Sequence, residues 1–404
     1  MQSTEELTLE MMAQKGLTIV LGDASSNLIQ SFVRSMTSIE YFSESTSLGR
    51  GRNLVLMNLL EFLSQRADDD THTLQAIPLS NMSMALLCIG SSPKSTSYSV
   101  FTLIERITPI RFHLDGDVLP DRTLPLPSLQ SIVKRIHDDV DISQLFAPAA
   151  AVRGIQPFHD FSEGPDWWNA EEYKHHFDQM HKLKMNFIGL HTYPLKEPTV
   201  WTGVTDDINA NGTVNKAYYS SYQNTGKGGD WGGVPGNTSG YVFGAHQIFS
   251  HECYGAETQM NPETEIVSNR TITEPLCPTP ITTTAQRVFF DRVGSMFNDA
   301  FTYAKKLGHL TCVGIESGNL GIAKPNPNVS SVEYFKGIFS RINRTYPIDY
   351  FWIWTQEGWT PRGDANIPLT DPSVQNPVKD MMAADQARKE LGLEDSLKLA
   401  TCGT

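Results

Sequence analysis

The sequence lacks the features that mark membrane-spanning, nucleic-acid-binding and zinc-finger proteins. No run approaches the roughly 20 consecutive apolar residues that a membrane-spanning helix needs. Basic residues are scarce, because 32 Lys and Arg stand against 45 Asp and Glu, for a net charge of −13. A surface this acidic repels phosphate backbones and anionic lipid, so we expect neither nucleic acid nor membrane as a partner. The five cysteines show no CxxC spacing, and no structural zinc site is expected.

Two common catalytic motifs are also absent. The glycine-rich stretch GKGGDWGG is not a phosphate loop, because no predicted strand precedes it, no helix follows it and the Lys-Ser/Thr pair is missing. No GxSxG sequence occurs, so the nucleophile elbow of the α/β-hydrolases is not supported.

The sequence gives mixed evidence on the cellular compartment. The start, MQSTEELTLEMM, lacks the basic-then-apolar order of a signal peptide, which indicates either a cytosolic protein or an absent N-terminus. Cys253 and Cys277 flank one loop-rich stretch and could form a disulfide in an oxidising compartment. Six N-x-S/T sequons lean towards a secreted glycoprotein, although chance explains them about as well. They begin at Asn81, Asn211, Asn237, Asn269, Asn328 and Asn343.

The length of 404 residues, with 40% hydrophobic and 19% charged residues, predicts two or three globular domains. Residues 1–150 alternate short apolar runs with stretches of helical spacing, which predicts a small N-terminal α/β sandwich domain. Its predicted strands are 17–22, 84–90 and 110–120, and its predicted helices are 54–65 and 97–107. The proline-punctuated segment 120–150 is the expected linker.

Residues 151–404 repeat the order strand, loop, helix, which predicts a parallel sheet in a TIM-type (β/α) barrel. Capping boxes at Asn169 with Glu172 and at Ser330 with Glu333 mark two helix starts, and Pro377 a third. The predicted strands are 153–161, 186–194, 241–249, 310–317, 349–359 and 397–403. Because these give about six of eight βα units, we expect a barrel truncated at its C-terminus. An open or miscounted sheet is the alternative.

The predicted active site lies at the C-terminal ends of these strands. A carboxylate directly after an apolar strand is costly to bury without a purpose, and Glu316 and Glu357 each follow such a strand. Two glutamates in one cleft supply the acid and the nucleophile or base that cleavage of a glycosidic bond needs. We therefore predict Glu316 and Glu357 as catalytic residues. The alternative for each is an ion pair with arginine or a helix cap.

Aromatic residues favour carbohydrate as the substrate. All seven tryptophans fall in the second half of the chain, and indole rings stack on the C–H faces of pyranoses. Trp352 and Trp354 share one strand face, and Trp354 and Trp359 are the ones predicted to lie in the cleft. The remaining predicted substrate-binding residues, which would bind sugar hydroxyls, are His159, Asp160, His191 and His246. This chemistry needs no cofactor.

A metal-dependent hydrolase is a competing interpretation of the histidines. Six side chains could contribute to a metal site: His159, Asp160, His191, His246, His251 and Glu252. Metal-dependent barrel hydrolases usually have two histidines at the end of the first strand, whereas this sequence has His-Asp. We therefore predict no metal ligands, and a purely structural role is a further alternative for each histidine.

The stretch RGIQPFHDFSEGPDWWNAEEYKHHFDQMHKLKMNFIGLHTYP resembles the opening of the catalytic barrel in exo-acting glycoside hydrolases. The resemblance is to the α-glucuronidase, β-hexosaminidase and α-N-acetylglucosaminidase kind, in which an RG-initiated first strand precedes a helix and an MNxI second strand. The segment SYSVFTLIERITPIRFHLDGDVLP resembles the end of the small α/β domain that precedes their barrel. The resemblance covers most of the chain from about residue 80 onward. It is specific in its architecture, but it does not single out one family.

This resemblance implies hydrolysis of a terminal sugar from an oligo- or polysaccharide. It places the general acid after the fourth barrel strand, which matches Glu316, and its partner on a later strand, for which Glu357 is the nearest match. The sequence departs from the pattern in two respects. A nucleophile on strand seven has no counterpart, and Ile315 stands where hexosaminidases have the Asp of an Asp-Glu pair. If the barrel is incomplete, a non-catalytic carbohydrate-binding protein is the alternative function.

Overall fold

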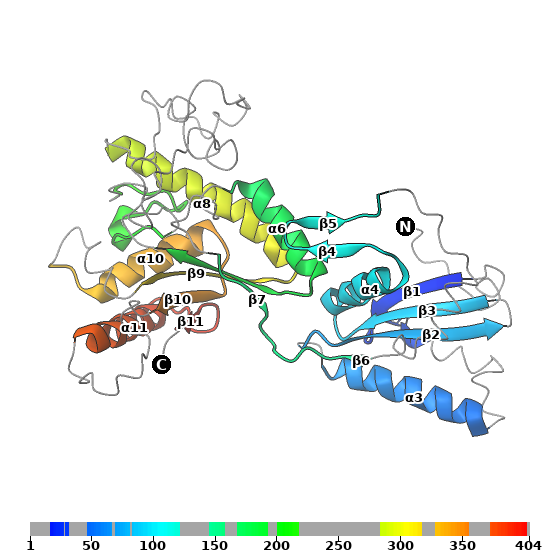
Figure 1. Ribbon diagram of the computed structural model, residues 1–404. Helices are drawn as coiled ribbons and strands as arrows, with labels where there is room; N and C mark the ends of the chain where they lie inside the picture. The colour runs from blue at the N-terminus through cyan, green and yellow to red at the C-terminus, as the bar shows by residue number, and fades with distance from the viewer. Residues whose placement is uncertain are drawn as a thin grey trace. The chain divides into compact units, whose positions relative to one another are not determined.

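The chain forms two compact units in a computed structural model (Figure 1). Unit 1 comprises residues 1–153 and 179–185, and unit 2 comprises residues 154–178 and 186–404. The structure describes residues 17–27, 29–31, 47–66, 69–80, 83–121, 145–157, 168–192, 200–217, 283–316, 328–354 and 372–401. Within these ranges no helix is both long enough and apolar enough to cross a membrane.

Unit 1 contains a four-stranded mixed sheet in the order β1-β3-β2-β6. Strands β1 (Leu17–Asp23) and β3 (Ser83–Gly90) pair in parallel, while β2 (His72–Ser80) runs antiparallel to β3 and to β6 (Leu145–Phe146). The sequence predicted β1 and β3, because each is a short apolar run that ends at Gly. It missed β2, in which His72, Thr73 and Gln75 interrupt the apolar pattern.

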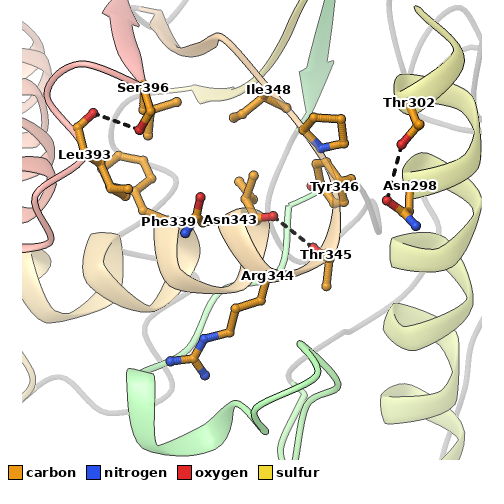
Figure 2. A pocket seen from close by; sticks show the side chains of 13 residues that line it. Asn298, Thr302, Phe339, Asn343, Arg344, Thr345, Tyr346, Ile348, Leu393 and Ser396 are labelled. Atoms are coloured by element: carbon orange, nitrogen blue, oxygen red, sulfur yellow. Dashed lines mark hydrogen bonds between the residues drawn. The ribbon is translucent and has the colours of Figure 1, made fainter. Parts of the chain in front are cut away.

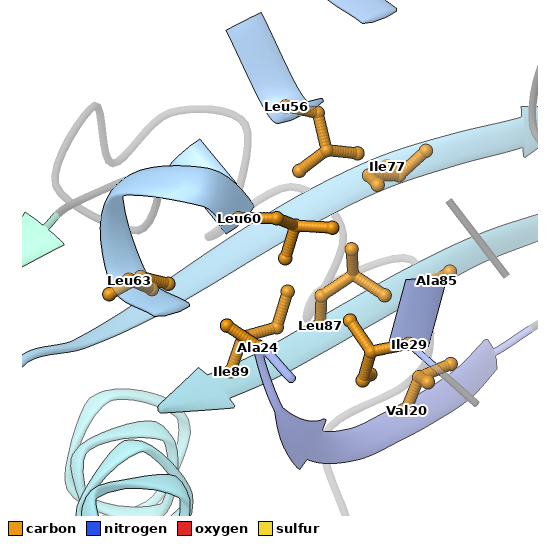
Figure 3. Packing of buried hydrophobic residues seen from close by; sticks show 10 residues of the cluster. All are labelled: Val20, Ala24, Ile29, Leu56, Leu60, Leu63, Ile77, Ala85, Leu87 and Ile89. Atoms are coloured by element: carbon orange, nitrogen blue, oxygen red, sulfur yellow. The ribbon is translucent and has the colours of Figure 1, made fainter. Parts of the chain in front are cut away.

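Two helices, one packed against each face, cover this sheet. Helix α3 (Ser47–Ser64) contributes Leu56, Leu60 and Leu63 to a core with the buried side chains of β1, β2 and β3 (Figure 3). Helix α4 (Pro93–Ile107) packs Leu103 against Leu74 on the opposite face. Burying one such leucine contributes about 1.5–3 kcal/mol, so these two clusters supply much of the stability of the sandwich.

One predicted strand of unit 1 is instead a hairpin. The sequence predicted a single strand at 110–120, but the chain turns at residues 114 and 115 between β4 (Arg111–His113) and β5 (Gly116–Val118). Asp115 is a common turn residue, and Gly116 has a φ of +153°, which residues with a side chain rarely adopt, so the strand is interrupted there.

Unit 2 contains a parallel five-stranded sheet whose strands follow the chain order. The order is β11-β10-β9-β8-β7, and every neighbouring pair is parallel. The strands are β7 (Gly154–Ile155), β8 (Phe187–Thr192), β9 (Leu310–Glu316), β10 (Tyr350–Trp354) and β11 (Lys398–Ala400). The predicted α/β class is confirmed. In the described part of the chain the sheet does not close into a barrel. The predicted strand 241–249 lies outside the described residues.

Helices alternate with these strands along the chain. They are α6 (Ala170–Lys182), α8 (Thr283–Lys306), α10 (Ser331–Thr345) and α11 (Pro372–Glu390), with a short 3-10 helix η5 (Thr205–Asp207) before α8. The connection between two neighbouring parallel strands is right-handed. Because each new strand is added to the same edge of the sheet as the strand before it, all the connecting helices lie on one face of the sheet. The burial agrees, since Ile188, Val313 and Phe351 are fully buried on one face.

The predicted helix starts are confirmed at two of three positions. The Asn169 amide donates to Glu172 Oε2 at 2.7 Å and the Glu172 amide donates to Asn169 Oδ1 at 2.9 Å, which completes the capping box of α6. Ser330 caps α10 through the Glu333 amide, at 3.2 Å. The third prediction was wrong, because α11 begins at Pro372 and Pro377 lies inside it.

Candidate active site

The C-terminal ends of β8, β9 and β10 meet at one edge of the unit 2 sheet. The strand register pairs Glu316 of β9 with Trp354 of β10, and Gly314 of β9 with both His191 of β8 and Trp352 of β10. Since side chains alternate between the faces of a strand, these five positions belong to one face of the sheet. Three predicted site residues, His191, Glu316 and Trp354, are therefore backbone neighbours at this edge.

The same face is the less covered one and carries aromatic rings. Phe187 and Tyr350 make an edge-to-face contact at 6.0 Å, and Trp352 and Trp354 make another at 6.3 Å. Tyr350 and Trp352 are half-buried, whereas the next residue of the strand, Phe351, is fully buried against α10. On the face opposite the helices, Tyr350 and Trp352 are therefore partly exposed, whereas Cys312 and Trp354 are buried.

An aspartate fixes the register of these strands at their other end. The Asp349 carboxylate accepts a hydrogen bond from the Thr311 amide at 2.7 Å and forms an ion pair with Lys305. The Asp349 amide donates to Thr311 O at 2.9 Å, and the Lys398 amide donates to Asp349 O at 2.8 Å. These bonds connect the beginnings of β9, β10 and β11, so they determine which residues stand level at the C-terminal edge.

The Trp352 indole shows how tightly this layer is built. Its Nε1 atom is buried and has no hydrogen-bond partner in the described residues. Gly314 lets the strand that carries Trp352 come this close, because a Cβ at position 314 would lie 2.6 Å from the Trp352 Cβ. The sequence pattern missed Tyr350 and Gly314 as parts of this surface. Strand alternation along YFWIW would have identified Tyr350 with Trp352 and Trp354.

Several predicted site residues lie outside the described residues. Among the residues proposed for catalysis or substrate binding these are His159, Asp160, His246, Glu357 and Trp359. The same holds for Cys253 and Cys277 and, of the alternative metal ligands, His251 and Glu252. Within the described part of the chain, no three His, Cys, Asp or Glu side chains come together as they would around a metal ion.

Two further tryptophans have structural roles. Trp201 is 1% exposed and donates from Nε1 to Lys216 O at 3.0 Å, so it is a core residue of the 200–217 segment. Trp168 stacks on His176, with ring centroids 3.9 Å apart, next to the cap of α6. Trp354 is 6% exposed, so its ring forms a wall rather than an open platform.

A cavity of about 480 Å³ lies away from this edge (Figure 2). It is lined by the last turn of α10, by Pro347 and Ile348 just before β10, and by Leu393, Ser396 and Leu397 after α11. Since Pro347 and Ile348 precede the strand that ends at Trp354, this cavity is at the N-terminal end of β10. Burial raises the pKa of Tyr346, beside this cavity, to about 12. The cavity therefore presents a neutral phenol at pH 7.

Comparison with known proteins gives only distant likenesses. No protein-family model and no curated protein matches the sequence. One solved structure with some likeness is a GH138 enzyme targeting pectin rhamnogalacturonan II, with 9% identity and a TM-score of 0.31 over 82% of this chain and 29% of that chain. Another is a family 89 glycoside hydrolase from Clostridium perfringens in complex with PUGNAc, with 12% identity and a TM-score of 0.30 over 93% of this chain and 41% of that chain. This chain spans less than half the length of either protein.

Proposed function

We propose that the protein is a glycoside hydrolase that cleaves a terminal sugar from an oligo- or polysaccharide, with Glu316 as general acid and Glu357 as its partner carboxylate. The observation that carries the proposal is the pairing of Glu316 with Trp354 at the C-terminal edge of a parallel sheet. Active sites of (β/α) barrels are built at this edge, and a glutamate and a tryptophan at paired strand positions are residue types that suit the cleavage of a sugar.

We infer that the sheet is one wall of a (β/α) barrel that begins after about residue 150. Five parallel strands in chain order, with helices between them, are the arrangement that a barrel wall requires. On this proposal, the face with the partly exposed Tyr350 and Trp352 lines the barrel interior. The sugar would be held by His159, Asp160, His191, His246, Trp354 and Trp359.

The proposed chemistry needs two carboxyl groups in different protonation states. Glu316 would protonate the glycosidic oxygen as the bond to the anomeric carbon breaks, and the carboxylate of Glu357 would attack that carbon or activate a water. A carboxyl separation of about 5–5.5 Å would give retention of configuration, and about 6.5–9.5 Å would give inversion.

The test compares Glu316→Gln with the wild-type chain on two kinds of substrate. General acid catalysis contributes about 10²–10⁴-fold, so we expect at least a 100-fold loss of kcat on natural glycan termini while glycan binding is retained. The loss should be smaller on dinitrophenyl glycosides, whose leaving group needs no proton. Glu394→Gln is the matched control, since Glu394 is an exposed glutamate after α11 and should keep full activity.

Each remaining outcome distinguishes an alternative. Full turnover by Glu316→Gln would end the assignment of the acid. A wild-type chain that binds on a glycan array but cleaves neither glycans nor aryl glycosides would be a carbohydrate-binding protein. Turnover that is lost on chelation and restored by one divalent metal would instead indicate a metal-dependent hydrolase.

A further inference from the structure

A second cavity of unit 2, of about 230 Å³, lies outside the proposed active site. It is formed by one face of α8, the last turns of α10 and the turn at 211–213. Its volume equals that of several water molecules, since each water occupies about 30 Å³ in the liquid. Exposed Ser295 and Asn298 of α8 stand at its rim, so the cavity is open to solvent.

A buried arginine belongs to the lining of this cavity. Arg341 of α10 is 1% exposed, and its Nη2 donates to Phe290 O at 2.5 Å. Its Nε and Nη1 atoms are buried without a hydrogen-bond partner in the described residues. A guanidinium group has five N–H donors and keeps its charge, so leaving two nitrogens unpaired away from water is costly.

The backbone of α8 is shaped to admit this guanidinium. A Cβ at Gly294 would lie 2.9 Å from Arg341 Nη2, so any larger residue there would displace the group. Burial lowers the pKa of Arg341, and the negative charge of Asp291 opposes that effect. The arginine is thus held in a fixed place beside the cavity.

The other lining side chains add positive charge and donors. Arg344 is exposed, and in Figure 2 it extends towards the 200–217 segment, where its Nη1 donates to Asn209 O at 3.2 Å. Asn298 Oδ1 accepts a hydrogen bond from Thr302, at 3.5 Å, so its Nδ2 group remains a donor. Asp291 is the one carboxylate of the lining, and its Oδ1 accepts from the Val214 amide at 3.1 Å. The described lining therefore contains two arginines and one carboxylate.

We propose that this cavity binds a small tetrahedral oxyanion, phosphate or sulfate, through Arg341 and Arg344 with Ser295 and Asn298 as neutral donors. Donors that come from two helices surround such an ion from several sides, which suits a tetrahedral anion better than a planar carboxylate. A bound anion would offset the cost of burying the Arg341 guanidinium charge, because a buried charge is stable only when an opposite charge pairs with it. The site is independent of the proposed glycosidase activity, because it uses no strand-end residue.

The test titrates the full chain with sodium phosphate and sodium sulfate by calorimetry, against sodium chloride and sodium acetate at equal ionic strength. We expect one site per chain for phosphate or sulfate, and a rise in Tm of roughly 3–6 °C at ten times its Kd. Both ions also stabilise proteins by exclusion from the surface, so the variants and not the Tm alone decide.

Four variants separate a bound ion from a general salt effect. Asn298→Asp places a negative charge at the rim of the cavity, and Arg344→Gln removes a positive charge from its lining. Each variant should weaken anion binding by at least about tenfold. Asn215→Asp is the matched control, because Asn215 is exposed in the same segment but does not line the cavity, and it should bind within twofold of wild type. Arg341→Met should abolish binding if it folds. Equal heats for chloride, unchanged affinity in both rim variants, or equal binding of acetate would each overturn the proposal.

Discussion

The contact between Gly314 and Trp352 makes a quantitative prediction about the edge that carries Glu316. In Gly314→Ala the new Cβ of residue 314 meets the carbonyl oxygen of Trp352 and lies 2.6 Å from the Trp352 Cβ. Real Cβ contacts are longer than 3.0 Å. Both atoms belong to the backbone region of β10, so they cannot give way by a rotamer change. Overpacking of this kind costs about 1–3 kcal/mol, and the rigid neighbour puts this site near the upper end.

The matched control is Gly189→Ala on the same face of β8. There the nearest atoms are side-chain atoms, Phe187 Cε1 at 3.1 Å and Trp352 Cε3 at 3.4 Å, which can move by a few tenths of an ångström. Removing a glycine also lowers the entropy of the unfolded chain by about 0.4–1 kcal/mol, which offsets a small clash. We therefore expect Gly189→Ala to stay within about 1 kcal/mol of wild type.

Tryptophan fluorescence measures this effect in unit 2 alone. All seven tryptophans lie between 167 and 359, and none of these positions belongs to unit 1. At about 2–4 °C per kcal/mol, Gly314→Ala should lower the Tm seen by fluorescence by roughly 6–12 °C, and Gly189→Ala by less than about 4 °C. A Tm of Gly314→Ala within 2 °C of wild type would refute the tight approach of β9 and β10.

Two further predictions concern other parts of the chain. Asn169→Ala removes half of the capping box with Glu172 and should lower the free energy of unfolding by about 1 kcal/mol in urea, whereas Asn215→Ala should leave it unchanged; equal stability of the two would argue against the cap. Burial lowers the pKa of His72 from 6.5 to about 4, so the unfolded chain binds a proton more tightly than unit 1 does. The stability of unit 1 should therefore be fully present above pH 6.5 and decline by up to about 3 kcal/mol as the pH falls to 4. Circular dichroism of His72→Gln should show a flatter pH dependence, and an unchanged slope would exclude His72 as the cause.

Local patterns allowed much of the secondary structure to be predicted. The apolar runs LTIVLG, MALLCIG and LTCVGIE fold as the strands β1, β3 and β9, because short β-rich segments leave little choice of structure. The Asn169–Glu172 box set the start of α6 to the residue, since two reciprocal bonds specify it. Pro377 was misread because a proline favours the first turn of a helix, whereas here a turn of helix precedes it.

The arrangement of the site was less accessible to sequence reasoning. Strand-end glutamates and aromatic residues can be found by pattern, and the edge where Glu316 pairs with Trp354 follows once the strands are known to be parallel and in order. The register itself depends on the Asp349 contacts with Thr311 and Lys398, which are long-range and leave no local pattern. The orphan donors of Arg341 were equally invisible, because an arginine near a helix end usually faces solvent.

Each unit carries its own buried thiol in the middle of its sheet. Cys88 of β3 and Cys312 of β9 are free and fully buried, and desolvation raises the pKa of Cys88 to about 11 and that of Cys312 further still. A native thiol of this kind reacts with an alkylating reagent only when its sheet opens. Peptide mapping after timed alkylation would then report two opening rates from a single sample, one for the sandwich and one for the parallel sheet. Their ratio would show whether the parallel sheet, which presents the Glu316 edge, can open while the sandwich stays closed.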